Sequence, residues 1–164
     1  MKTLYVFRHA KAERDSETGP DFDRPLAEQG WRDAELVGRE MRARGLDVDG
    51  VLASPAKRAM ETVAAFARGY GAVDPVYEPG IYNAPVGRLL DIVSNADDSI
   101  ERLLMVGHNP GFEELVRHLA DEWLAEGLPT AGLVAIELSA DRWSDVPQRT
   151  GRISARIAPR DLRD

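Results

Sequence analysis

Leu4-Tyr5-Val6-Phe7, followed at once by Arg8-His9, is the stretch that decides the fold. Four apolar residues rich in β formers are too short a run for a helix, so they predict a strand near the start of the chain. The run Arg102-Leu103-Leu104-Met105-Val106-Gly107 is also a predicted strand, and it leads into His108. A histidine therefore follows the carboxyl end of each of these two strands.

Strand and helix patterns alternate along the rest of the chain. Short β-rich runs are separated by stretches in which apolar residues recur every three or four positions. The segment 8–25 is charged and is expected to be a long loop, and the polar segment 139–151 is expected to be exposed. The expected strands are 4–7, 50–53, 75–77, 102–107, 133–138 and 152–157, and the expected helices are 27–44, 54–68, 86–95 and 110–125.

This alternation predicts an α/β fold, a three-layer sandwich whose central sheet is mostly parallel and carries helices on both faces. The last two strands are expected to form a hairpin at one side of the sheet, which gives one antiparallel edge strand. A length of 164 residues suits a single domain over 1–164. Residues 158–164 are expected to be a frayed tail, and Trp31 and Trp123 lie on apolar stripes that predict core positions.

Composition excludes several classes of function. The net charge of −7 argues against nucleic-acid binding, which needs a basic face. The chain has no cysteine, so disulfides, thiolate metal sites and a cysteine nucleophile are excluded. No apolar run approaches the roughly 20 residues of a membrane span, and no signal-peptide pattern begins the sequence, so a cytoplasmic location is expected. The three histidines lack metal-site spacing, so no metal site is expected.

Candidate functional residues gather where strands end. Ligands of an open α/β sheet bind beyond the carboxyl ends of its strands. Arg8-His9, Arg58 and His108 all follow such ends. Ser54-Pro55 and Asn109-Pro110 each combine an N-cap residue with a proline suited to the first helical position, so a helix N-terminus is expected beside each strand end. Two arginines and two helix N-termini make a pocket for a dianion, with phosphate as the best fit.

The two histidines suggest phosphoryl transfer. A histidine beside two arginines is pushed towards its neutral form, whose free nitrogen can attack phosphorus and carry the phosphoryl group. The second histidine, protonated, would stabilise the charge on the transferring oxygens.

Three motifs resemble those of the histidine phosphatase superfamily. They are Arg8-His9-Ala10, the segment Ser54-Pro55-Ala56-Lys57-Arg58-Ala59-Met60-Glu61-Thr62, and Val106-Gly107-His108. Within the superfamily, the chain is most similar to the small phosphohistidine phosphatase branch, through Arg8-His9-Ala10-Lys11, Asp23-Arg24-Pro25-Leu26 and Leu128-Pro129-Thr130-Ala131. Ala10 stands where most of the superfamily has glycine, a change that is frequent in this branch.

The resemblance implies a role for individual residues. His9 would be the nucleophile, while Arg8, Arg58 and His108 would hold the phosphoryl oxygens. Glu78 is either the proton donor for the leaving group or a plain surface acid. Lys11 would touch the substrate or be a solvated loop charge, and Thr130 would bind near the phosphate or serve only as a turn residue.

Three functions are open at this point. The first is hydrolysis of phosphohistidine on a protein, which suits an open site because few residues are available for a lid. The second is a small-molecule phosphomonoesterase, and the third is a phosphate-binding module without turnover. The expected partners are a phosphorylated protein or a small phosphate ester, without nucleic acid, membrane or cofactor.

Overall fold

A six-stranded mixed sheet forms the centre of the computed structural model, which describes residues 1–163. The strands lie in the order β3-β2-β4-β1-β5-β6. Their bounds are Lys2–Arg8 (β1), Gly50–Ala53 (β2), Pro75–Tyr77 (β3), Arg102–Gly107 (β4), Leu133–Leu138 (β5) and Arg152–Ile157 (β6). Each expected strand is present, and the structure extends the first one at both ends.

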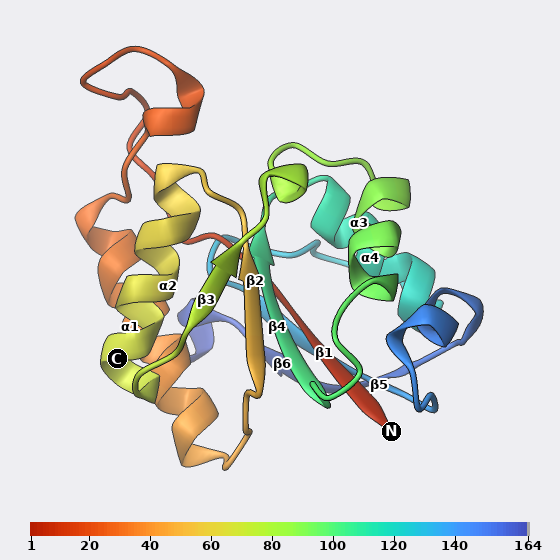
Figure 1. The fold of residues 1–164 in the computed structure, drawn as a ribbon. Coiled ribbons are helices and arrows are strands. Elements are labelled where there is room, and N and C mark those ends of the chain that lie inside the picture. The colour runs from red at the N-terminus through yellow and green to blue at the C-terminus, as the bar shows by residue number, and fades with distance from the viewer. Residues whose placement is uncertain (164) are drawn as a thin grey trace.

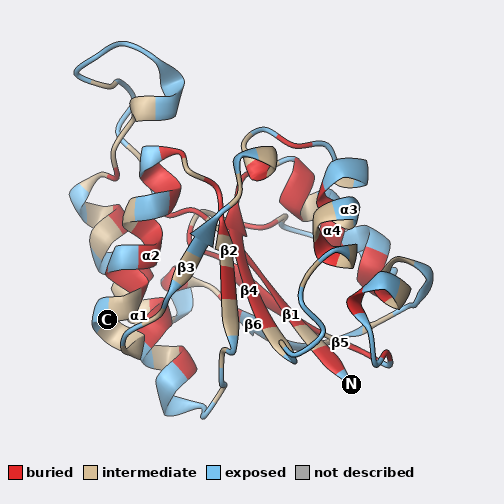
Figure 2. Cartoon of the chain, in the orientation of Figure 1, coloured by how far each residue is buried: buried red, intermediate tan, exposed pale blue. Residues whose placement is uncertain are grey.

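Helices cover both faces of this sheet, as Figure 1 shows. One face packs against α1 and α2 around Phe7 and Phe66, and the other packs against α3 and α4 around Met105 and Phe112. Buried residues line the sheet and the inner sides of the helices (Figure 2). The predicted three-layer α/β fold is confirmed. The helices are Glu28–Ala43 (α1), Lys57–Tyr70 (α2), Val86–Ser94 (α3) and Gly111–Ala120 (α4).

The antiparallel part of the sheet is the β5–β6 hairpin. β5 pairs antiparallel with β1, and β6 pairs antiparallel with β5. The strand that runs against the others is therefore β5, one position in from the edge, while β6 forms the edge itself. β1, β4 and β2 are neighbours and run parallel, so their carboxyl ends lie side by side.

Two helices begin later than predicted. α2 starts at Lys57 with Ala56 as its N-cap, and α4 starts at Gly111 with Pro110 as its N-cap. Ser54 and Asn109 therefore precede the caps instead of acting as caps. The Ser54 hydroxyl accepts from the Ala56 N–H at 3.2 Å, which turns the chain before the helix begins.

Two tryptophan environments differ from expectation. α4 ends at Ala120 instead of Ala125 because Asp121 adopts a left-handed conformation, φ 48°. Trp123 therefore leaves the apolar stripe and is 68% exposed, with Arg117 stacked on its ring. Trp143, in the segment expected to be exposed, is fully buried, and its indole N–H donates to the Ile100 carbonyl at 2.7 Å. Trp31 packs partly buried against the α1–α2 side.

The chain end is also more ordered than expected. Residues Pro159–Asp161 form a 3-10 helix (η4). The Arg163 guanidinium donates two hydrogen bonds to the buried carboxylate of Asp33 in α1, at 3.1 and 2.6 Å. The expectation of a frayed tail over 158–164 is therefore wrong for 159–163, and residue 164 lies outside the described residues. Among residues 1–163 there is no helix with the length and apolarity to span a membrane.

Candidate functional site

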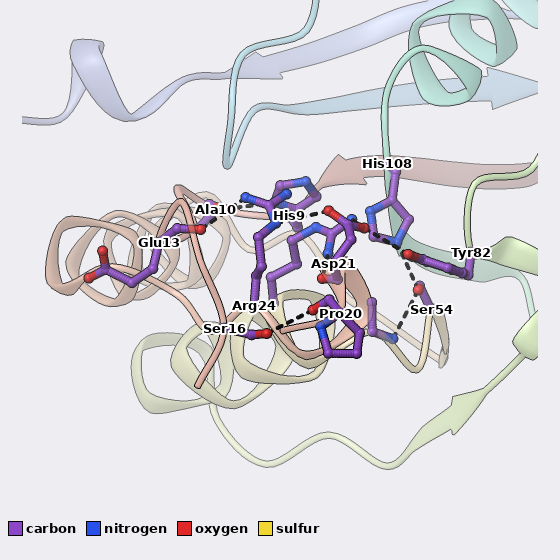
Figure 3. Close-up of polar contacts among 12 residues, drawn as sticks. His9, Ala10, Glu13, Ser16, Pro20, Asp21, Arg24, Ser54, Tyr82 and His108 are labelled. Carbon is purple, nitrogen blue, oxygen red and sulfur yellow. Dashed lines mark hydrogen bonds and ion pairs between the residues drawn. The ribbon is translucent and has the colours of Figure 1, made fainter. Parts of the chain in front are cut away.

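Two buried histidines lie together where β1 and β4 end. His9 is 8% exposed and His108 is 5% exposed, and their ring centroids are 5.2 Å apart (Figure 3). Gly107, which precedes His108, lets the end of β4 pack against Phe112, because a Cβ there would lie 2.5 Å from that ring. The structure thus brings together two strand ends that are about a hundred residues apart in sequence.

His9 has one ring nitrogen fixed and the other available. Its Nδ1 lies 2.7 Å from the carbonyl oxygen of Ala10. A carbonyl only accepts, so Nδ1 carries the proton and Nε2 keeps its lone pair. Burial, assisted by the charges of Arg58 and Arg8, lowers the pKa of His9 to about 4. His9 is therefore neutral near pH 7, as a histidine nucleophile must be.

His108 is held by a serine that sequence analysis assigned only to a helix cap. Its Nε2 is 2.8 Å from the Ser54 hydroxyl, at the end of β2. Burial and the neighbouring His9 lower the pKa of His108 to about 3, so the ring is neutral near pH 7 among these neighbours. This differs from the protonated form expected from the sequence. A bound dianion would favour the protonated form, because opposite charge raises a histidine pKa.

The arginines contribute unpaired buried donors. Arg8 donates from Nη1 to the Leu128 carbonyl at 3.1 Å, and Arg58 donates from both Nη atoms to Asp21. Three buried nitrogens have no hydrogen-bond partner within residues 1–163: Arg8 Nε, Arg58 Nε and His108 Nδ1. Buried polar groups are normally paired, so such a group of unpaired nitrogens is suited to an anion.

Thr62 connects the first motif to the second. Its fully buried hydroxyl accepts from the Ala10 N–H at 3.0 Å and donates to the Arg58 carbonyl at 2.7 Å. One side chain therefore sets the end of β1, which carries His9, against the first turn of α2, which carries Arg58. Ala10 is fully buried and does not have a positive φ, so an alanine fits where glycine is more usual.

Sequence analysis did not identify Asp21 and Tyr82 as part of this site. Asp21 lies in the short 3-10 helix Asp21–Asp23 (η1), and Tyr82 follows the 3-10 helix Pro79–Ile81 (η2). The Tyr82 hydroxyl donates to Asp21 at 2.7 Å, and its ring packs edge-on against His108 at 5.5 Å. The only local signal was an acid and an aromatic in loops, which is too common to single out.

The other predicted site residues are Thr130, Lys11 and Glu78, and each lies in a different environment. Thr130 is next to Ala131, whose N–H donates to the His9 carbonyl at 3.0 Å, so it lies close to the site. The Lys11 side chain is exposed. Glu78 accepts from the Gly80 N–H at 3.0 Å and lines a groove with Arg88. The structure does not pair Glu78 with either histidine within the described chain, and substrate contact by Lys11 and Thr130 stays a prediction.

Comparison with known proteins extends this picture. The sequence pattern of the histidine phosphatase superfamily (branch 1) matches residues 4–99. An uncharacterised protein of Mycobacterium tuberculosis is 34% identical over 150 residues, covering 85% of this chain and 90% of that protein. These matches agree with the resemblance that the motifs predicted.

Two solved structures share the fold. One is a candidate phosphohistidine phosphatase SixA from Agrobacterium tumefaciens, with a TM-score of 0.82 and 29% identity over 96% of this chain and 99% of that one. The other is the protein histidine phosphatase SixA complexed with tungstate, with a TM-score of 0.84. Its identity is 19% over 98% of this chain and 99% of that one, so it supports the fold alone.

Proposed function

Because the chain belongs to the histidine phosphatase superfamily, we propose that it hydrolyses phosphohistidine on a protein through a phosphoryl intermediate on His9. The observation that carries the proposal is the state of His9. Its Nδ1 proton is held by the Ala10 carbonyl, so Nε2 keeps its lone pair. The charges of Arg58 and Arg8 act on this ring, and the Nε of each arginine has no hydrogen-bond partner within residues 1–163. This arrangement combines a nucleophile with donors for phosphoryl oxygens.

The reaction has two steps. First, Nε2 of His9 attacks phosphorus as the bond from phosphorus to the substrate nitrogen breaks. That nitrogen keeps the electron pair, and the other nitrogen of the substrate ring carries a proton, so imidazole leaves neutral. Second, water attacks the phosphoryl group on His9, the new P–N bond breaks with its electron pair returning to Nε2, and inorganic phosphate leaves with the oxygen and the protons of water. Arg8, Arg58 and His108 hold the phosphoryl oxygens in both steps, and no cofactor takes part in this scheme.

Within residues 1–163, no carboxyl group is hydrogen-bonded to either histidine, which favours phosphohistidine as substrate. Asp21 accepts hydrogen bonds from Arg58 and from Tyr82, whose ring packs on His108. Its pKa is lowered to about 2 through its bond from Tyr82 and the nearby arginines. It therefore holds no proton to donate near pH 7. An imidazole nitrogen leaves phosphorus more easily than an alkoxide does, so a phosphoramidate needs a donor less. Glu78 as proton donor stays a prediction of lesser weight.

Labelled phosphoenzyme would test the mechanism. We expect wild-type protein mixed with a radiolabelled phosphohistidine carrier protein and quenched with alkali to retain label that acid removes. His9→Ala should retain none, and His118→Ala, altered at an exposed histidine of α4, should label like wild type. Absence of labelled enzyme during wild-type turnover would contradict a His9 intermediate.

Substrate class is tested separately, by comparing kcat/KM for phosphohistidine protein with kcat/KM for small phosphate esters. We expect the phosphohistidine protein to be preferred and Glu78→Gln to leave its turnover largely unchanged. Rapid ester hydrolysis with untouched phosphohistidine would assign the protein as a small-molecule phosphomonoesterase instead. Binding of both without turnover would make it a phosphate-binding module. We also expect a cytoplasmic location, which cell fractionation would test.

A further inference from the structure

Both Nη groups of the Arg58 guanidinium donate hydrogen bonds to the same residue, Asp21. Its Nη1 donates to the Asp21 carbonyl oxygen at 2.9 Å, and its Nη2 donates to Asp21 Oδ2 at 3.1 Å. The Arg58 side chain is only 4% exposed, whereas that of Asp21 is 51% exposed. The buried cation is thus oriented by a residue that reaches it from a surface loop.

Asp21 is itself fixed by further donors. Arg24 Nε donates to Oδ1 at 2.9 Å, and the Tyr82 hydroxyl donates to Oδ2 at 2.7 Å. Arg24 also donates to the carbonyl of Glu13 at 2.9 Å, which ties down the start of the loop (Figure 3). A carboxylate with this many partners has little freedom to turn.

Within residues 1–163, the Nε–H of Arg58 stays unpaired while both Nη groups bind Asp21. A guanidinium is planar and rigid, so fixing both Nη atoms also fixes the direction of Nε–H. Nε is one of the three buried nitrogens with no partner in the described chain. Asp21 therefore occupies the Nη groups and leaves Nε for an anion.

We infer that Asp21 is a positioning residue, which holds the guanidinium of Arg58 so that its Nε–H binds the phosphoryl group. This inference rests on the proposed function of the same site. Without Asp21, the long Arg58 side chain would have to give up rotamer freedom each time a phosphoryl group bound. Asp21 acts as an acceptor throughout and takes no part in proton transfer.

Inorganic phosphate is the probe for this inference, used as a competitive inhibitor of the full-length protein. Loss of one hydrogen bond to a charged group changes a dissociation constant by about tenfold. Asp21→Ala should therefore raise the phosphate Ki and the substrate KM about tenfold. Asp21→Asn keeps an oxygen for Arg58 and should raise them by a smaller factor. Tyr82→Phe, which removes one donor to Asp21, should also have a smaller effect than Asp21→Ala.

A matched control comes from the same 3-10 helix. The Asp23 carboxylate accepts from the Thr18 hydroxyl at 2.7 Å, away from Arg58, so Asp23→Asn should leave Ki and KM unchanged. The melting temperature of each variant separates positioning from loss of the fold. If Asp21→Ala does not fold, Asp21→Asn and Tyr82→Phe carry the test.

Two results would overturn the inference. An unchanged phosphate Ki in folded Asp21→Ala would show that Arg58 is oriented without Asp21. A lower Ki would show that the carboxylate competes with phosphate for Arg58. Both are distinguishable from failure of the proposed function, which would appear in the wild type as no phosphate inhibition and no labelled His9.

Discussion

At the scale of single residues, the candidate site favours the neutral forms of two adjacent histidines. His9 and His108 are buried within 5.2 Å of each other, beside two arginines. Each neighbour disfavours protonation of the others, and burial is the largest cause of the lowered pKa of both rings. Burial and nearby positive charge thus leave His9 neutral near pH 7, as the proposed mechanism requires. The same arrangement should make the fold sensitive to acid.

Stability should therefore fall as pH drops from about 6.5, the usual histidine pKa, towards 4. In this window the unfolded chain binds protons that the native histidines, with pKa values of about 4 and 3, do not bind. The destabilisation is absent above pH 6.5, and each histidine accounts for roughly 2–3 kcal/mol by pH 4.5.

Urea denaturation at pH 7, 5.5 and 4.5 measures the free energy of unfolding at each pH. His9→Gln should weaken the pH dependence, and His118→Gln should leave it unchanged. If the free energy of unfolding changed equally with pH in His9→Gln and in the wild type, this account would be contradicted.

At the scale of elements, the site is held by contacts between neighbouring segments. The end of β1 and the start of α2 are joined through the hydroxyl of Thr62, which serves the Ala10 N–H and the Arg58 carbonyl at once. The end of β2 supplies Ser54 to His108. These residues bear no charge, but they set the distances at which charged ones act.

Replacing Thr62 by valine should test this link, because valine has the same shape without the hydroxyl. The Ala10 N–H would lose its buried acceptor, at a cost of about 1–2 kcal/mol of stability. The displacement of His9 from Arg58 should also lower kcat/KM several-fold. Chemical denaturation and steady-state kinetics measure the two effects. Thr150→Val, at an exposed position, is the control and should change neither. A Thr62→Val protein with wild-type kcat/KM would show that this link does not set the geometry.

How far the sequence predicts the molecule also depends on the element concerned. His9 and His108 could be predicted because each follows a strong strand pattern, and parallel strands bring their carboxyl ends together. Asp21 could not, since its partner is set by the path of a long loop and leaves no periodic trace. The apolar stripe continues past Ala120 and so predicts a core position for Trp123, but the left-handed Asp121 ends α4 before it. The polar neighbours of Trp143 in the sequence give no sign that its side chain is buried.

At the scale of the whole molecule, the chain end is fastened to a distant helix. Arg163 binds the carboxylate of Asp33, whose side chain is 2% exposed, and Gln29 donates to the same carboxylate at 2.6 Å. This ion pair joins residues 130 positions apart. It lies in neither histidine motif, so its effect should be on folding alone.

Arg163→Met should destabilise the protein by about 1–3 kcal/mol, because it leaves a buried carboxylate without its cation. This range is below that of a fully buried pair, since the Arg163 side chain is 45% exposed and partly screened by solvent. Arg160→Met is the matched control: Arg160 pairs with Glu126 where both side chains are exposed, so little change is expected. Urea midpoints measure stability, and kcat should be unchanged in both. Equal midpoints for the two variants would refute the proposed difference.

The two borders of the sheet bear on how the protein behaves when crowded with copies of itself. An open strand border presents unpaired N–H and C=O groups on which another chain can add, which is a route to aggregation. β3 has only three residues and begins with Pro75, which has no N–H. β6 carries Arg152 and Arg156, which form ion pairs with Glu137 and Glu122. The short length of β3 and the charges on β6 therefore discourage edge-to-edge pairing of sheets into larger assemblies.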